Sequence, residues 1–233
     1  MQRKALMRVT LCVGALMVMI LALTACSSGS TQHEEKTKSR PVPENPQPLS
    51  PGEYHSVNFD PSFYFKLGKG WSSLDVHASD ALAFSREAQT RWMGFTNVQK
   101  VYKPPAKDTS TGKPNVVKAP KDLVGWFQHH PYLNASKPKP VTVGGVKGEQ
   151  FDIVVEVPEG YYAACGTDCM DIYMLSGGDP VGFEDGIKTR IIVYEDISGE
   201  VVANDIGVSE ASEFDEFMIE AKKVLDTVKW GGS

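Results

Sequence analysis

The chain has 233 residues, of which 24 are Lys or Arg and 29 are Asp or Glu, giving a formal net charge of −5. An acidic surface of this kind is repelled by nucleic acid and by anionic lipid headgroups. The composition therefore argues against a nucleic-acid partner and against attachment to a membrane through bulk charge. The length suits one domain with a substantial core.

The N-terminal residues have the layout of a secretion signal. Three basic side chains fall within the first eight residues, and an uncharged apolar run of 15 residues follows from Val9 to Leu23. That run is shorter than the roughly 20 residues that a helix needs to span a bilayer. It ends in Leu-Thr-Ala-Cys, with the cysteine at position 26. Removal of the first 25 residues would leave 21 basic against 29 acidic residues, a net charge of −8.

The string Leu-Thr-Ala-Cys resembles the lipobox of bacterial lipoproteins. The resemblance implies a signal peptide over residues 1–25 and a lipidated Cys26, carrying acyl chains such as palmitate, that becomes the new N-terminus. The protein would then lie on the extracytoplasmic face of the cell membrane. Two acyl chains suffice for stable anchoring, so no second membrane-binding surface would be needed. The alternative is an ordinary signal peptide with a cysteine at this position by chance.

Residues 26–52 are rich in Ser, Thr, Glu, Lys and Pro and contain almost no large apolar side chains. Such a segment cannot bury enough surface to order itself, so the sequence predicts a disordered tether. A single folded domain is then expected over residues 53–233.

The first half of that domain is predicted to form short strands. Apolar and polar residues alternate over Phe63–Leu67 and again over Met93–Tyr102, which is typical of half-buried strands. The pattern stops over Lys103–Pro120, an 18-residue stretch of Pro, Gly, Lys and Thr that we expect to be a loop. Asp122 is then placed to cap a short helix, which Pro131 ends.

Two hairpins are predicted in the second half. Val141–Val143 and a run that begins at Val146 are joined by Gly-Gly, which allows the positive φ of a tight turn. The β-branched runs Arg190–Glu195 and Glu200–Ile206 form the second hairpin.

The last predicted elements are a helix and a strand. Ser212 and Asp215 form a capping-box-like start, and apolar residues follow at helical spacing. Thr227–Trp230 is interpreted as a closing strand that packs back on the sheet. The order of strands, short helix, hairpins and helix has no alternating βαβ rhythm. It therefore favours the α+β class, an antiparallel sheet with helices packed on it.

Four short stretches carry a resemblance to a known family. They are an aromatic strand leading to Gly-Trp (63–71), Leu-Val-Gly-Trp before His-Pro (123–131), Val-Thr-Val-Gly-Gly (141–145) and Val-Leu-Asp-Thr-Val (224–228). In these the chain resembles actinobacterial-type lipoproteins with a Mog1/PsbP-like domain, over most of residues 53–230. The resemblance implies an α/β/α sandwich around an antiparallel sheet. It implies no activity, because members of that group largely have none assigned.

Two cysteines would remain in the exported domain after lipidation. Cys165 and Cys169 lie in the string Cys-Gly-Thr-Asp-Cys, and an exported chain sits in a compartment where disulfides persist. We predict a disulfide between them, which requires a turn rather than an extended strand. The alternative, a metal site with Asp168 and Asp171, lacks two further soft ligands nearby. We therefore expect no metal and no cofactor.

No sequence template for catalysis is present. The strings Gly-x-Ser-x-Gly and His-Glu-x-x-His do not occur, and there is no Gly-rich phosphate-binding loop. His129 and His130 are adjacent, so they point about 100° apart on a helix and suit its C-terminal end better than a shared metal. We therefore name no catalytic residue. The paired carboxylates of a glycoside hydrolase leave no recognisable string, so a hydrolase that uses acidic loop residues stays an alternative.

Charge is unevenly distributed along the domain. Between Lys147 and Lys188 there are nine acidic residues and no basic one, whereas residues 99–121 carry six Lys and one Asp. The functional interpretation is a mobile basic loop for an anionic partner, and an acidic, Tyr-bearing region for a cationic ligand or Ca²⁺. The alternatives are solvated loop surface, or docking of the two segments on each other. The candidate binding residues are Lys103, Lys107, Lys113, Lys118, Tyr161, Tyr162, Asp168 and Asp171.

The sequence thus predicts a lipid-anchored, extracytoplasmic binding or interaction module of the bacterial cell envelope. Its expected partners are the membrane, through the lipid on Cys26, and an anionic wall polymer or an envelope protein. The alternatives are a cell-envelope hydrolase and an accessory subunit of an envelope complex, which a large exposed apolar patch would favour.

Overall fold

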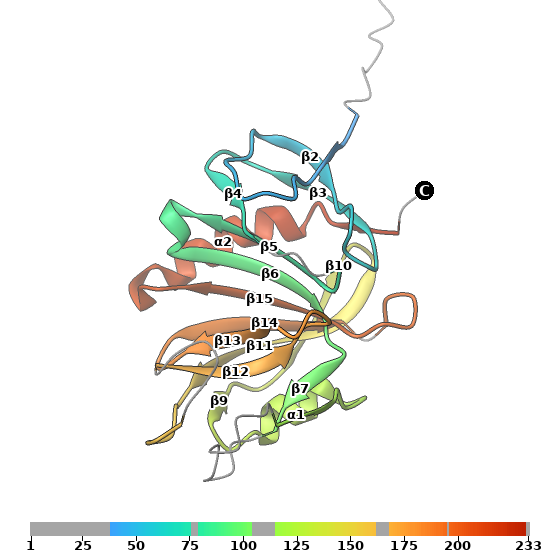
Figure 1. The fold of residues 1–233 in the computed structure, drawn as a ribbon. Helices are drawn as coiled ribbons and strands as arrows, with labels where there is room; N and C mark the ends of the chain where they lie inside the picture. Colours follow the sequence, from blue (N-terminus) through green and yellow to red (C-terminus); the bar gives the residue numbers. More distant parts are fainter. Residues whose placement is uncertain (1–37, 76–78, 104–114, 162–167, 195, 232–233) are drawn as a thin grey trace, which may run out of the picture. The chain divides into compact units, whose positions relative to one another are not determined.

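A computed structural model describes residues 38–75, 79–103, 115–161, 168–194 and 196–231, which belong to one folded unit beginning at Thr37. Its strands form three sheets (Figure 1). The first sheet has the order β1 (Arg40–Pro41), β2 (Gly52–His55), β3 (Phe63–Leu67), β16 (Lys229–Trp230). The central sheet has the order β10 (Lys139–Val143), β11 (Val146–Val155), β14 (Lys188–Tyr194), β15 (Val202–Val208), β6 (Arg91–Asn97), β5 (Ala81–Arg86), β4 (Trp71–Ser73), with β9 (Leu133–Ala135) also paired to β11. The third sheet has the order β13 (Pro180–Glu184), β12 (Cys169–Met174), β7 (Lys100–Tyr102), β8 (Val116–Lys118).

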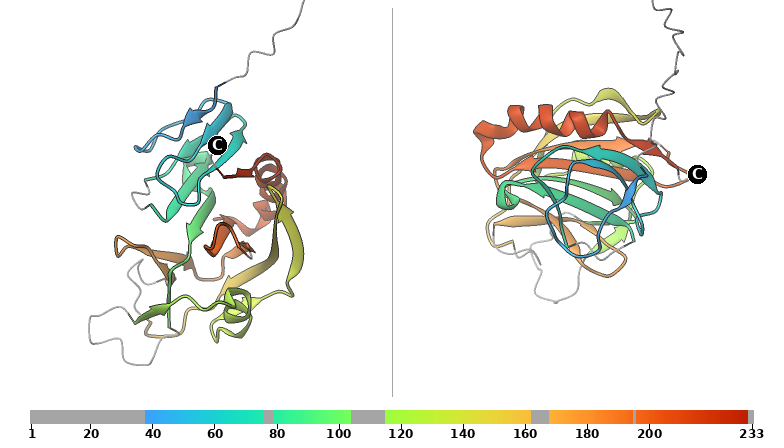
Figure 2. Two further views of the ribbon diagram at one scale, coloured as in Figure 1. Left: turned by 90° about the vertical axis from the view of Figure 1, so that its right-hand side faces the viewer. Right: turned by 90° about the horizontal axis from the view of Figure 1, so that it is seen from above.

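Two α-helices accompany the sheets. Helix α2 (Phe214–Leu225) lies against β15 and β3, whereas α1 (Leu123–His129) lies against β9 (Figure 2). All ladders between the described strands are antiparallel except β1–β2. The predicted α+β class is therefore confirmed.

The central sheet separates two hydrophobic cores. On β14, Ile192 and Tyr194 enter a first core that they share with the first sheet and α2. Ile191 and Val193, on the opposite face, enter a second core with the third sheet and α1. This alternation follows from the two-residue period of a strand. Each face of the central sheet is thus covered by a helix and a small sheet, and it is the small sheets that the sequence did not predict.

The elements predicted from local signals are present. Asp122 caps α1, because its Oδ1 accepts a hydrogen bond from the backbone N–H of Gly125 at 2.7 Å. Gly144 and Gly145 form the β10–β11 turn with φ values of 58° and 83°, which glycine adopts without strain. The second predicted hairpin is β14–β15.

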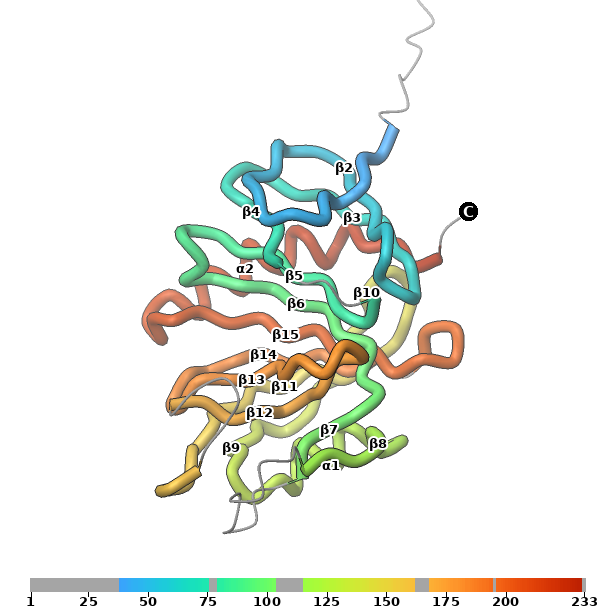
Figure 3. The backbone as a smooth tube through the Cα atoms, viewed as in Figure 1, coloured from blue at the N-terminus to red at the C-terminus, as the bar shows by residue number. Residues whose placement is uncertain are grey.

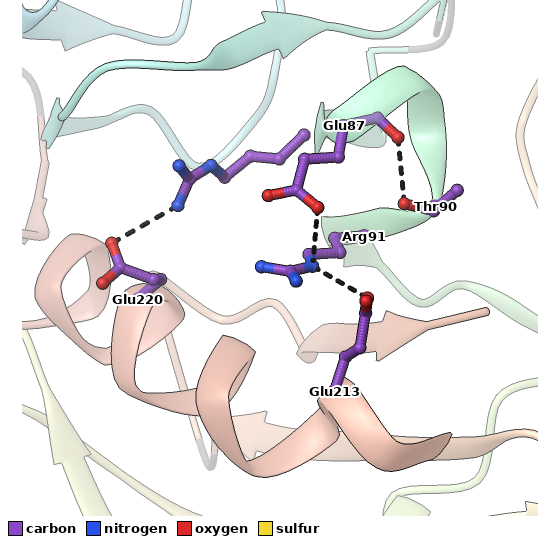
Figure 4. Close-up of polar contacts among 6 residues, drawn as sticks. Glu87, Thr90, Arg91, Glu213 and Glu220 are labelled. Atoms are coloured by element: carbon purple, nitrogen blue, oxygen red, sulfur yellow. Dashed lines mark hydrogen bonds and ion pairs between the residues drawn. The ribbon is translucent and has the colours of Figure 1, made fainter. Parts of the chain in front are cut away.

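The predicted start of the last helix is wrong. A 3₁₀ turn, η2 (Ala211–Glu213), precedes α2, and the N-cap residue Glu213 makes no side-chain capping hydrogen bond. Ser212 and Asp215 therefore do not form a capping box. The carboxylate of Glu213 instead lies 3.1 Å from Nε of Arg91 on β6 (Figure 4). An ion pair to the central sheet fixes this end of the helix.

The turn between β5 and β6 faces the same helix (Figure 4). Its residues 87–89, labelled η1 (Glu87–Gln89), have φ values from 50° to 76°, a left-handed region that non-glycine residues rarely adopt. Glu87 pairs with Arg91 at 3.2 Å, and Arg86 donates a hydrogen bond to Glu220 of α2 at 3.3 Å. Two arginines that flank the turn thus connect the β5–β6 hairpin to α2.

The folded unit includes the last part of the predicted tether. β1 pairs with β2, and Val42 and Leu49 are buried in the first core. Nη2 of Arg40 donates hydrogen bonds to the carbonyls of Ser50 and Pro51 at 2.8 and 2.9 Å. The prediction that the folded part begins at residue 53 therefore sets its start too late.

The closing strand is present as β16, which pairs with β3. The Trp230 ring lies 4.9 Å from that of Phe63 and 5.2 Å from that of Tyr194, and its Nε1–H donates to the carbonyl of Val143 at 3.1 Å. Trp230 thus joins β3, β10 and β14. Within the described ranges, no helix combines the length and the apolar character that crossing a bilayer requires.

Candidate functional site

The third sheet joins the acidic and the basic segments of the chain. Strands β12 and β13 come from the acidic segment, and β7 and β8 from the basic one. The two pairs meet where Tyr173 lies opposite Val101. Figure 3 shows how the backbone leaves β6 of the central sheet and enters β7. One interpretation of the charge pattern was that the two segments dock on each other. The described strands do so, because β12 of the acidic segment pairs with β7 of the basic segment.

Asp171 lies at the inner side of this junction. It is 5% exposed on β12, close to the tyrosines at 102 and 161. Burial, and secondly the charge of Asp171, raise the pKa of Tyr102 to about 12. The same two causes raise the pKa of Tyr161. The structure thus brings Asp171 and Tyr161 together, but in a nearly closed setting rather than an open cation site.

The other predicted residues of the acidic region have different positions. Asp168 is exposed immediately before β12, where its carbonyl accepts a hydrogen bond from the backbone N–H of Asp185 at 2.8 Å. Cys169 is buried as the first residue of β12. Tyr162 and Cys165 lie outside the described residues, as does Cys26. The disulfide and the lipid anchor stay predictions.

The two histidines at the end of α1 have separate surroundings. His129 is exposed, and its Nδ1 lies 2.7 Å from the carbonyl oxygen of Gly125. His130 is buried against the ring of Trp126, and burial lowers its pKa to about 4. Both are end-of-helix residues, as predicted.

Three lysines of the basic segment line one cleft. Lys100 lies directly opposite Lys118 across the β7–β8 ladder, and Lys121 follows three residues later. The cleft has a volume of about 740 Å³, and one of its described lining residues, Glu200, is acidic. Within the described part of the chain, none of the three ammonium groups takes part in an ion pair. Their charge is therefore available to a ligand.

Backbone hydrogen bonds hold the walls of this lysine cleft together. The N–H of Val98 donates to the carbonyl of Val201, and the N–H of Ala119 donates to the carbonyl of Gln99, both at 2.8 Å. The apolar part of the lining includes Val98, which is 4% exposed, together with Val116, Ala119 and Val201. The cleft thus combines three lysines with apolar side chains, and hydrogen bonds of the backbone hold its walls in place.

The sequence predicted only part of this cleft. Of the four candidate lysines, Lys118 lines it, and Lys103 is exposed just beyond β7, where its N–H donates to the carbonyl of Asn115 at 2.8 Å. Lys107 and Lys113 lie outside the described residues. The expected loop ends earlier than predicted, because residues 116–118 form β8. Lys100 and Lys121 belong to the basic segment but are not among the predicted binding residues. Their place beside Lys118 depends on the register of β7 and β8, which the sequence does not show.

Sequence reasoning also missed a buried carboxyl group at Asp205 on β15. The side chain is 5% exposed, and burial raises its pKa to about 6. Its own backbone and the Trp92 side chain donate hydrogen bonds that oppose this shift. The signal was present in the sequence, since Asn204 and Asp205 interrupt an otherwise apolar strand run.

Comparison with known proteins gives no family assignment. No protein-family model matches the chain, and no curated protein matches it. Solved structures do show similarity. A protein from Bacteroides thetaiotaomicron is 11% identical with a TM-score of 0.37, over 79% of this chain and 50% of the other. The chain thus spans about half the length of that protein.

Two further structures are matched over most of their length. The cyanobacterial PsbP (CyanoP) of Synechocystis is 12% identical with a TM-score of 0.39, over 78% of this chain and 92% of the other. LpqN of Mycobacterium tuberculosis, described as involved in cell envelope biogenesis, is 9% identical with a TM-score of 0.27, over 81% of this chain and 91% of the other. A PsbP protein is thus among the structural neighbours. Likenesses at this level carry no argument about activity.

Proposed function

We propose that this protein is a lipid-anchored, extracytoplasmic binding module whose lysine cleft takes an anionic polymer of the cell envelope. The observation that supports the proposal is the convergence of Lys100, Lys118 and Lys121, none in an ion pair within the described residues, on one cleft of about 740 Å³. The protein as a whole is acidic, so the positive charge of this cleft does not follow from the overall composition.

The type of cation favours a polymer over a single small anion. Lysine ammonium groups act as mobile point charges, whereas arginine forms the rigid fork that suits bidentate capture of one phosphate or carboxylate. Three separate ammonium groups around one cleft can each pair with a different anionic group of a chain that repeats its charge. The apolar part of the cleft lining would then contact the uncharged parts of that polymer between its anionic groups.

The cleft is tested with the triple variant Lys100→Gln, Lys118→Gln, Lys121→Gln. Two defined probes, poly(glycerol phosphate) and polygalacturonate, distinguish phosphate from carboxylate polymers, and dextran serves as the neutral polymer. Each exposed ion pair contributes up to about 1 kcal/mol, so loss of three should weaken binding by about tenfold or more. Added salt should weaken binding of the unmodified protein in the same way, because the charges are exposed.

The matched control is Lys69→Gln, Lys137→Gln, Lys147→Gln, which removes the same charge from exposed positions outside the cleft. It is expected to bind as the unmodified protein does. Equal weakening by the two triple variants would reduce the effect to bulk charge, and absence of binding to both anionic probes would remove the proposed ligand class.

The anchor is tested separately with Cys26→Ala. We expect this variant to leave the membrane fraction, whereas Cys12→Ala, a change within the predicted signal, should leave fractionation as it is. Mass spectrometry of the mature protein should find acyl chains on Cys26. Unchanged fractionation of Cys26→Ala with no added mass at Cys26 would contradict the anchor while leaving the lysine cleft untouched.

A further inference from the structure

A second cavity, separate from the lysine cleft, has Asp205 in its lining. It measures about 370 Å³, within the range of small-molecule pockets, and lies between the β5–β6 part of the central sheet and the segment that joins β12 to β13. We call it the Asp205 pocket. Small residues of both walls, among them Ala81, Ala83, Gly94 and Gly182, line it together with acidic ones.

Two glycines of the central sheet make room for the carboxyl group. Asp205 pairs with Gly94 across the β15–β6 ladder, and a Cβ at Gly94 would lie 2.7 and 2.9 Å from the two carboxyl oxygens. Two residues further along the ladder Gly207 pairs with Trp92, whose ring covers the space where a Cβ of Gly207 would be. The Trp92 side chain donates a hydrogen bond to Asp205. The carboxyl group therefore occupies space that a side chain at position 94 would fill.

Further polar groups surround this carboxyl group. Tyr173 and Thr189 are fully buried, and their hydroxyl oxygens have no hydrogen-bond partner among the described residues. Thr189 pairs with Gly207, two residues along β15 from Asp205. Tyr173 is close enough for the Asp205 charge to add to burial in raising its pKa. Of these side chains only Asp205 lines the pocket, so its carboxyl is the group that a ligand would meet.

The charge of the pocket selects the kind of ligand. Asp75, Asp179 and Asp205 line it, and none of the described lining residues is Lys, Arg or His. Such a cavity attracts cations. Among the described residues, no three His, Cys, Asp or Glu side chains come close enough together to hold a metal ion. An organic cation, which needs one carboxylate partner rather than a coordination shell, fits this arrangement.

We infer that the Asp205 pocket binds a small molecule that carries a protonated amine, with the ammonium group on the Asp205 carboxylate. The small side chains of Ala81, Ala83, Gly94 and Gly182 leave space for the body of the molecule. Asp75 and Asp179 add negative charge to the lining, which favours the same sign of ligand.

Butylamine and butan-1-ol test this assignment, because they have nearly the same shape and differ in charge. Titration of the isotope-labelled full chain at pH 7 should give saturable shifts at the amides of Ala83, Gly94 and Gly182 with butylamine and not with butan-1-ol. Asp205→Asn should weaken butylamine binding at least tenfold. Asp215→Asn, which removes the same charge from an exposed position on α2, should leave binding unchanged.

A second variant keeps the carboxyl in place. Ala83→Leu fills the pocket from β5 and should abolish the butylamine shifts even if Asp205→Asn fails to fold. Absence of saturable shifts at these amides, equal binding of butan-1-ol, or undiminished binding by either pocket variant would overturn the assignment.

Discussion

Replacing Phe63 with Ala is expected to lower the free energy of unfolding by about 3–5 kcal/mol, the range for loss of a buried aromatic side chain. Phe63 is fully buried, and its ring centroid lies 4.7 Å from that of Phe95, 4.9 Å from Trp230 and 5.2 Å from Phe65. These partners come from the central sheet, β16 and β3 itself. The variant would open a cavity where the first sheet meets the central sheet.

Urea unfolding measures the Phe63 effect as a shift of the midpoint at unchanged slope. Val57→Ala is the control, because Val57 is 53% exposed and its truncation should change stability by no more than about 0.5 kcal/mol. A loss below about 1 kcal/mol at Phe63 would mean that the first sheet does not pack on the central sheet through this ring.

The second large effect is expected from Asp205→Asn and depends on pH. Burial raises the pKa of Asp205 to about 6, against an ordinary value of 3.8. Between pH 4 and 6 the folded protein therefore keeps a proton that the unfolded chain has released, so its stability falls as the pH rises through this window. A shift of about two pKa units corresponds to about 3 kcal/mol. The unmodified protein loses this contribution to the free energy of unfolding above pH 6. The Asp205→Asn variant has no titrating group at this position, so it shows no such loss.

The measurement is the difference in unfolding free energy between the two proteins at pH 4 and pH 7. It should change by about 3 kcal/mol in favour of Asp205→Asn. Asp215→Asn, at an exposed position, should show little change with pH. A difference for Asp205→Asn that is constant from pH 4 to pH 7 would show that this carboxyl titrates as an exposed one does.

The predictions that succeeded rest on short-range signals. Asp122 caps α1 through a residue three positions away, and the glycines at 144 and 145 turn a hairpin whose strands are adjacent in sequence. Fold class followed from the order of such elements. A cap or a tight turn is decided within about four residues, so its signal is present in the sequence itself.

The features that the sequence did not reveal depend on long-range register. The Asp205 pocket exists because β15 pairs with β6 so that a carboxyl lies opposite Gly94. The lysine cleft requires Lys100 on β7 and Lys118 on β8 to be cross-strand neighbours. A change of one residue in either register would turn these side chains to the opposite face. The residues of both sites can be identified in the sequence, but the pairing of the strands that brings them together cannot.

The pairing of β3 with β16 has a consequence for biosynthesis. The N–H of Lys66 donates to Oγ1 of Thr227 at 2.8 Å, across 161 positions of the chain, so β3 is synthesised long before its partner strand. Contacts of such high sequence separation form late in folding. Until β16 is added, a nascent chain lacks the Trp230 ring that packs against Phe63 in the folded protein, and Phe63 can contact other chains. This is the interval in which a holding chaperone would protect the protein from aggregation.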